Sequence, residues 1–167
     1  MKKGILMLVL IFTILVVGCR REDVKEPQKS ETIEDSNATK DTEMNSGIDL
    51  EELDAYMTSV KEQSDIIKNS LENDTLTQTD MNLKSQELYE LWDGALNYVW
   101  SKLKSGLSED EFSNLLDEQR IWIAEKEKSV EEAGKEFEGG SMYSLVVNME
   151  AAKITEERVY ELYEFFK

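Results

Sequence analysis

The sequence has no histidine, one cysteine, one proline and eight glycines among its 167 residues. The lack of histidine excludes His-metal sites, Ser-His triads and Cys-His dyads. A single cysteine excludes cysteine clusters and any intrachain disulfide. The scarcity of proline and glycine leaves few turn signals, which favours long helices over a sheet of many strands. We therefore predict no metal site and no cofactor.

Basic residues are also few, since 19 Lys and Arg stand against 36 Asp and Glu, a formal net charge of −17. Nucleic-acid phosphates require clusters of Lys and Arg, so this balance argues against nucleic acid as a partner. It argues equally against adhesion to anionic lipid by charge alone. We expect the partner to be a protein.

Paired carboxylates are the remaining candidates for catalysis. Glu109 with Asp110, or Glu131 with Glu132, could imitate the acid and base of a glycosidase. These pairs lie on solvated faces of predicted helices, without an apolar pocket that would raise a carboxyl pKa. We therefore expect no enzymatic activity and assign no catalytic residue.

The first eighteen residues have the parts of a secretory signal peptide. Two lysines precede an apolar run over residues 5–17, which is shorter than the ~20 residues that a membrane-spanning helix needs. The run ends at Gly18 and Cys19, which resembles the lipobox of bacterial lipoproteins, where the cysteine thiol is acylated and the chain is cut before it. The acyl chains would then be the only membrane contact, on the extracytoplasmic face of the cell membrane. The alternative is an ordinary signal peptide with an incidental cysteine.

Residues 19–46 are predicted to form a linker after the lipidated cysteine. Between Arg20 and Gly47 the only apolar residues are Val24, Ile33, Ala38 and Met44. Such a segment cannot bury enough surface to offset the entropy of ordering it, so we expect a disordered tether.

From residue 47 onward the apolar residues recur with the three-and-four spacing of amphipathic helices. We predict a helix over 47–74 that packs on a domain over 75–167, and in that domain helices over about 79–105, 108–137 and 141–166. Ser108 opens a capping box, and Ser141 is the expected N-cap of the last helix. The expected core contains Trp92, Trp122, Leu115 and Leu162. The predicted fold class is all-α: a small antiparallel bundle of about four helices preceded by a disordered tether.

Four polar residues interrupt or border the apolar stripes: Asn97, Gln119, Thr155 and Arg158. An unpaired buried polar group costs about 1–3 kcal/mol, so each of them needs a partner. Two interpretations stay open. One is an interhelical hydrogen-bond network that fixes the helix register, and the other is a ligand pocket.

Several short motifs follow one another along the chain. They are Met81-Asn82, Leu96-Asn97, Gln119-Arg120-Ile121-Trp122-Ile123, Gly139-Gly140-Ser141, and Thr155-Glu156-Glu157-Arg158 with Leu162. Together, over about residues 80–166, they resemble the domain of the LprI-type lysozyme inhibitor lipoproteins. The resemblance implies a small helical domain exported to the cell envelope. It also implies mostly structural roles for the motif residues Asn97, Gln119, Arg120, Trp122, Gly140, Ser141, Thr155 and Arg158.

The chain departs from the pattern of that family in two places. Members from oxidising compartments often carry a cysteine pair, and the corresponding positions near Val130 and Glu150 hold no sulfur. Lys126-Glu127 stands where Arg-Asp often follows the tryptophan, so the bidentate fork of arginine is lost. Because the cysteine pair is missing, packing contacts must replace the disulfide bond.

Two functions stay open. The first is a cell-surface lipoprotein that binds another protein and inhibits a cationic lysozyme, as the resemblance implies, with its acidic surface speeding the encounter. The candidate contact is the turn with Gly139, Gly140, Met142 and Tyr143, because paired glycines let a backbone enter a narrow cleft. An ordinary helix–helix connection is the alternative for this turn. The second function is an envelope adaptor or stress-related lipoprotein with no enzymatic activity.

Overall fold

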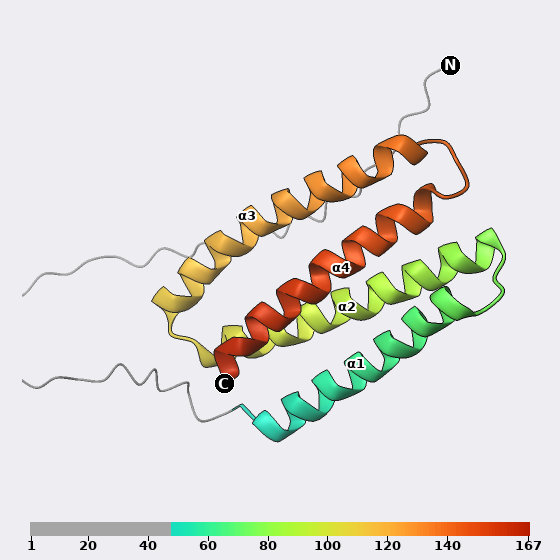
Figure 1. Cartoon of the computed structure of the whole chain (residues 1–167). Helices are drawn as coiled ribbons and strands as arrows, with labels where there is room; N and C mark the ends of the chain where they lie inside the picture. The colour runs from blue at the N-terminus through green and yellow to red at the C-terminus, as the bar shows by residue number, and fades with distance from the viewer. Residues whose placement is uncertain (1–47) are drawn as a thin grey trace, which may run out of the picture. The chain divides into compact units, whose positions relative to one another are not determined.

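The structure is a computed structural model, and it describes residues 48–167. The predicted signal peptide, the lipidation site at Cys19 and the tether lie outside the described residues. Over 48–167 the chain forms helices without a strand: α1 (Leu50–Asn73), α2 (Gln78–Gly106), α3 (Glu109–Gly134) and α4 (Tyr143–Tyr163). Single 3-10 turns follow α3 and α4 as η1 (Lys135–Phe137) and η2 (Glu164–Phe166) (Figure 1). The predicted all-α bundle of four helices is confirmed.

Side chains at the first three helix starts explain why these helices begin where they do. Asp49, Thr77 and Ser108 each accept a hydrogen bond from the backbone N–H three residues further on. Thr77 and Ser108 belong to complete capping boxes, in which the third residue bonds back to the cap. The capping box predicted at Ser108 is confirmed.

The start of α4 differs from the prediction. Its N-cap is Met142, which makes no side-chain cap bond, so the expected N-cap at Ser141 is wrong. The reason is the preceding turn, in which the Tyr143 N–H donates to the Gly140 carbonyl at 3.3 Å. This turn already brings Met142 into the right-handed helical region, and the helix begins one residue later than the sequence indicates.

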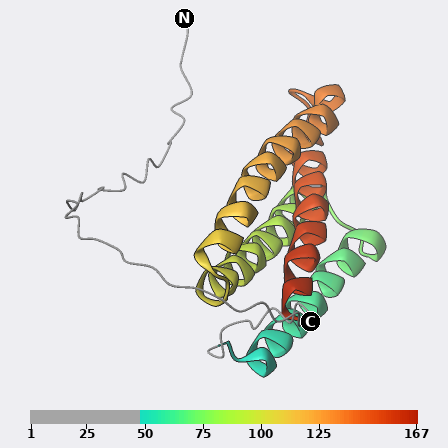
Figure 2. The same cartoon turned by 90° about the vertical axis from the view of Figure 1, so that its left-hand side faces the viewer.

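The helices α2 and α4 pack on each other more extensively than any other pair and form the centre of the domain. The helix α1 packs on α2, and α3 packs on α4 (Figures 1 and 2). One hydrophobic core joins α1, α2 and α4, and α3 contributes a single side chain to it. Its members include Leu53, Met57, Val60 and Ile67 from α1, Leu88, Trp92, Ala95, Val99 and Leu103 from α2, Leu115 from α3, and Ala152, Val159 and Leu162 from α4.

The helix α3 is the least buried of the four. Over its 26 residues only Leu115, Gln119 and Gly134 are buried. Trp122, predicted as a core residue, is instead half-buried and packs against the edge of the core. Its neighbour Ile123 is 41% exposed. The helix α3 packs mainly on α4, and toward α2 it makes side-chain contacts such as the ring pair of Trp100 and Phe112, whose centroids are 5.2 Å apart.

The negative charge is concentrated on the two outer helices. Residues 48–167 contain twelve Lys and Arg against twenty-eight Asp and Glu, a net charge of −16. Segments 48–74 and 109–138, which contain α1 and α3, carry net charges of −6 and −7. The central segments 75–107 and 143–167 carry −1 and −2. Within the described part of the chain, no helix combines the length and apolarity that crossing a membrane requires.

Candidate binding site between the second and third helices

Gln119 and Arg158, two of the family-motif residues, meet between α3 and α4. The Arg158 Nε donates to Gln119 Oε1 at 3.0 Å, and its Nη1 pairs with Glu161 Oε2 at 3.0 Å. The Arg158 guanidinium carbon also lies 6.0 Å from the centre of the Trp122 ring. This cluster is an interhelical link, which is one of the two interpretations that the sequence left open for its polar residues.

Two other polar motif residues behave differently. Asn97 is exposed, and its Nδ2 donates within its own helix, to the Asp93 carbonyl at 2.9 Å and the Asp93 carboxylate at 3.2 Å. Thr155 is fully buried, and its hydroxyl donates to the Ala151 carbonyl one turn back at 2.7 Å. Both side chains donate within their own helix, so the interpretation as an interhelical hydrogen-bond network is wrong for these two residues. Arg120, also a motif residue, is exposed and pairs only with Asp117 on its own helix at 2.7 Å.

Because α3 stands off from α2, a groove opens between them, and we refer to it as the α2–α3 groove. Its volume is about 360 Å³. The lining side chains are Asp93, Leu96, Asn97 and Trp100 from α2, and Leu116, Gln119, Trp122, Ile123 and Lys126 from α3. Three motif residues, Asn97, Gln119 and Trp122, thus reach one surface. The groove has the mixture of aromatic, apolar and a few polar groups that is typical of binding sites.

Lys126 marks one end of this groove. Its Nζ lies 5.1 Å from the centre of the Trp122 ring and 5.4 Å from that of Tyr89, within the range of cation–π attraction. A second hollow, of about 250 Å³, continues beyond Lys126 toward the start of α4. Lys126 therefore places a cation on the indole face of Trp122.

The sequence analysis did not single out Asp93, Trp100 or Lys126 as site residues. A signal was present for two of them, because Asp93, Asn97 and Trp100 follow each other at spacings of four and three and so share one face of a helix. This face is separate from the stripe that carries Trp92. Only the spacing between α2 and α3 shows that it borders a groove.

The turn proposed from the sequence as a partner contact lies at the end of the domain where α3 leads into α4. Gly139 has φ of +76°, a conformation that side chains disfavour, and residues 138–143 are exposed. Asn82 from α2 donates to the Ser141 carbonyl at 3.0 Å and holds the turn in place. Met142 is 43% and Tyr143 39% exposed, so the turn presents two apolar side chains to solvent. None of these residues lines the α2–α3 groove.

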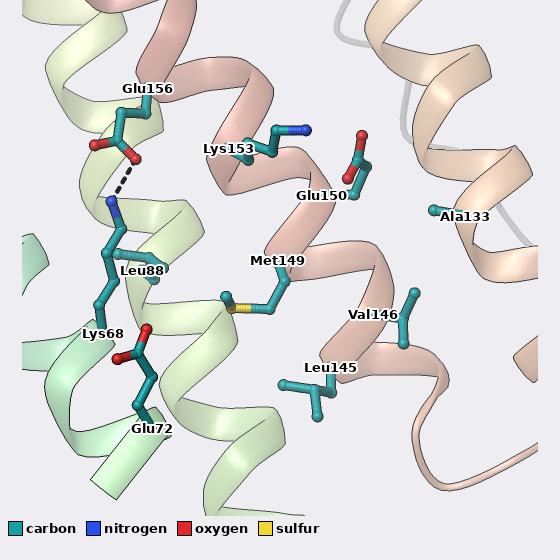
Figure 3. Close-up of a pocket in the computed structure, with 10 residues that line it drawn as sticks. All are labelled: Lys68, Glu72, Leu88, Ala133, Leu145, Val146, Met149, Glu150, Lys153 and Glu156. Carbon is teal, nitrogen blue, oxygen red and sulfur yellow. Dashed lines mark hydrogen bonds and ion pairs between the residues drawn. The ribbon is translucent and has the colours of Figure 1, made fainter.

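A larger hollow than the α2–α3 groove lies elsewhere, beside α4 and the end of α1 (Figure 3). Its volume is about 520 Å³, and Leu88, Leu145, Val146 and Met149 form its apolar surface. Lys68 reaches from α1 to Glu156 on α4 and forms an ion pair of 2.6 Å across one end (Figure 3). Its walls bring together neither the polar motif residues nor the tryptophans.

Residues 48–167 give little support for metal binding or for acid–base catalysis by buried carboxyl groups. No group of three or more acidic side chains there is placed to hold a metal ion. The carboxylate pairs considered from the sequence, at 109–110 and 131–132, are all exposed. These features define a small acidic helical protein with a groove suited to binding.

The comparison with protein families agrees with this class. The family described as Lysozyme inhibitor LprI matches residues 69–162, more than half of the chain. The chain belongs to this family, which is one of inhibitors and not of enzymes. No curated protein and no solved structure matches the chain.

Proposed function

We propose that the protein is a lipid-anchored, extracytoplasmic binding protein that inhibits a cationic lysozyme. Membership of the lysozyme inhibitor family over residues 69–162 is the observation that carries this proposal. The net charge of −16 on residues 48–167 supports it, because lysozymes are typically basic. Opposite charge accelerates encounter and suppresses wrong partners.

Charge alone does not make an inhibitor. Exposed charges are screened beyond about 8 Å at physiological salt, so packed contacts must supply much of the affinity. The described chain exposes several large apolar side chains beside its acidic helices. Ile123 is 41% exposed on α3, and Met142 and Tyr143 are exposed on the following turn. Such side chains, surrounded by carboxylates, can anchor a basic surface.

An inhibition assay tests this proposal. The mature chain from residue 19, carrying Cys19→Ser to keep it soluble, is added in increasing amounts to a basic c-type lysozyme acting on bacterial cell walls. We expect inhibition that weakens with salt but persists at physiological salt. An unrelated acidic protein of similar size and charge is the control. Inhibition that occurs only at low salt, or equally with the control, would be a polyanion effect, and no inhibition would favour the envelope adaptor.

The anchor needs a separate test. Cys19 is the acceptor of the lipid in this proposal, so Cys19→Ser should remove the acylation and leave the protein unprocessed or released. Metabolic labelling with a palmitate analogue measures this directly. Equal labelling of the wild type and the variant would contradict a lipid on Cys19.

The turn at 138–143 is the second candidate contact. Tyr143→Ala and Met142→Ala remove its exposed apolar side chains without changing charge. If the turn enters the partner, both variants should inhibit lysozyme less. Met142→Ala should melt near the wild-type temperature, whereas Tyr143→Ala also removes the ring that packs beside Gly134. Unchanged inhibition would make the turn an ordinary connection between α3 and α4.

A further inference from the structure

The α2 wall of the α2–α3 groove offers hydrogen-bond acceptors without matching donors. Asp93 receives a bond on Oδ2 from Asn97, and no hydrogen bond within residues 48–167 reaches its Oδ1 or the Asn97 side-chain carbonyl. Asp93 also forms no ion pair with a described residue, although it is half-buried. A carboxylate and a carbonyl beside the Trp100 ring form a site for a cation, and a planar guanidinium matches it best.

The α3 wall has the opposite character. Gln119 is 7% exposed, and Arg158 already bonds to its Oε1. Its Nε2 makes no hydrogen bond to a described residue. Among the described residues, the fully buried side-chain nitrogen without a hydrogen-bond partner is Arg158 Nη2, so Gln119 Nε2 keeps some access to solvent, and Gln119 lines the groove. A nearly buried amide with unused donors can bond to an acceptor of a molecule that occupies the groove.

Between the two walls the groove is apolar, with Leu96, Leu116 and Ile123 lining it. An occupant must therefore present a cationic donor toward Asp93, an acceptor toward Gln119 and apolar atoms between them. An extended loop of a basic protein has all three, as an arginine or lysine head, a backbone carbonyl and the methylenes of the basic side chain. Lys126 contacts the Tyr89 ring, one turn before Asp93. A cation is therefore favoured on the other side of Asp93, toward Trp100, where no basic side chain of residues 48–167 lines the groove.

We propose that the α2–α3 groove is the surface that binds the cationic partner, and that it takes one basic side chain of that partner between Asp93 and Trp100. The naming of this partner as lysozyme rests on the proposed function. The charge complementarity is local as well as global, since the segment 109–138 that forms one side of the groove carries a net charge of −7. The groove thus adds a defined anchor to the general attraction.

Two neighbouring isoleucines of α3 supply a matched pair of variants. Ile123 lines the groove, and Ile121, which is more exposed, does not. Ile123→Lys places a positive charge and a long side chain at the groove, and Ile121→Lys makes the same chemical change outside it. We expect Ile123→Lys to weaken binding of a basic c-type lysozyme at least about tenfold, and Ile121→Lys by less than about threefold.

A second pair of variants separates the effect of the carboxylate in the groove from the effect of the overall net charge. Asp93→Asn removes the carboxylate in the groove, and Glu87→Gln removes an exposed carboxylate elsewhere on the same helix. We expect about a tenfold loss of affinity for the first and little change for the second. Melting temperatures of all four variants establish that they are folded. If the groove variants bind lysozyme as their controls do, the groove proposal fails and lysozyme inhibition can still stand.

A small probe tests the groove without lysozyme. The acetylated and amidated peptide Gly-Arg-Gly is titrated into the isotope-labelled chain from residue 19, with its citrulline analogue as the uncharged control. We expect the NMR signals of the Asn97 and Gln119 side-chain amides to shift with a Kd of about 10 mM or below. The Asp93→Asn variant should lose this response.

The outcomes of the peptide titration are distinct. Shifts with the arginyl peptide and none with lysozyme would leave the groove as a site for another basic protein and reject the proposed function. No shift, or an equal shift with citrulline, would overturn the groove proposal. Shifts produced instead by an N-acetylglucosamine oligomer would also overturn it, because they would make the groove a glycan site.

Discussion

Arg158 on α4 donates a hydrogen bond from Nε to Oε1 of Gln119 on α3, over 3.0 Å. The Arg158 side chain is only 11% exposed and has an ion pair with Glu161, yet its Nη2 has no partner among the described residues. The helix α3 contributes just one apolar side chain to the buried core, and this hydrogen bond joins α3 to α4 beside it.

The first prediction concerns this link. Gln119→Leu leaves the Arg158 Nε without its acceptor, and a buried donor without a partner costs about 1–3 kcal/mol. We expect a loss of that size in the free energy of unfolding, measured with urea. Arg120→Leu is the neighbouring control, because its pair with Asp117 is exposed on both sides and contributes about 0–1 kcal/mol.

A double variant sharpens this test. Gln119→Leu combined with Arg158→Met removes both partners, so its loss of stability should be smaller than the sum of the two single losses. Additive losses would mean that the two side chains do not depend on each other. A cost for Gln119→Leu no larger than for Arg120→Leu would also contradict the importance of the link.

The helices were predictable because spacing and capping act locally. The apolar three-and-four pattern and the box at Ser108 depend only on residues within one or two turns, and the structure has helices where these signals predict them. Gln119 and Asn97 show where this reasoning ends. Both are polar residues next to apolar stripes, but Gln119 reaches another helix while Asn97 bonds to its own.

The difference between these two residues depends on the distance between helices, which periodicity does not report. The same limit explains Trp122 and the groove. A stripe on α3 predicts that one face is covered, yet α3 packs on α4 and leaves the α2 side open. The site could therefore be predicted only as a set of polar residues, and not as a surface.

The second prediction compares two tryptophans. Trp92 is fully buried, and its Nε1 donates to the Ser64 hydroxyl at 3.1 Å. Trp92→Ala should cost about 3–5 kcal/mol and unfold the domain or nearly so. Trp122 is half-buried, so Trp122→Ala should cost less, about 1–3 kcal/mol, and leave a cooperative thermal transition. Circular dichroism during heating measures both, and equal losses would contradict the difference in burial.

The third prediction concerns alkaline pH. Tyr163 on α4 donates a hydrogen bond to the Asp54 carboxylate on α1, and this bond, together with burial, raises the pKa of Tyr163 from 10.0 to about 12. The neutral phenol is favoured in the folded state, so the stabilisation is complete below pH 10 and is lost as the pH rises through 12.

The test for Tyr163 is Tyr163→Phe, which removes the hydroxyl and keeps the ring. We expect a loss of about 1 kcal/mol at neutral pH. Between pH 10 and 12 the variant should lose less stability than the wild type, because it has no phenol to titrate at this position. Unfolding in urea at several pH values measures the effect. Parallel pH profiles of the two proteins would show that Tyr163 does not contribute to the alkaline loss.

The last prediction uses two helical glycines with opposite surroundings. Gly134 is buried near the end of α3, and a Cβ built there would lie 2.7 Å from Val147 Cγ1 and 2.8 Å from Tyr143 Cε2 on α4. Gly94 lies in the exposed middle of α2, and a Cβ there meets nothing within 4 Å. Gly134→Ala must therefore push α3 away from α4 or displace the two α4 side chains, at a cost of about 1–3 kcal/mol. Gly94→Ala should instead stabilise the domain by about 0.5–1 kcal/mol, because alanine loses less entropy than glycine in a helix. Thermal unfolding measures the change in stability of both variants. The two changes should have opposite signs, although the substitution is the same. If Gly134→Ala stabilised the domain, this would contradict the close approach of α3 to α4 at this glycine.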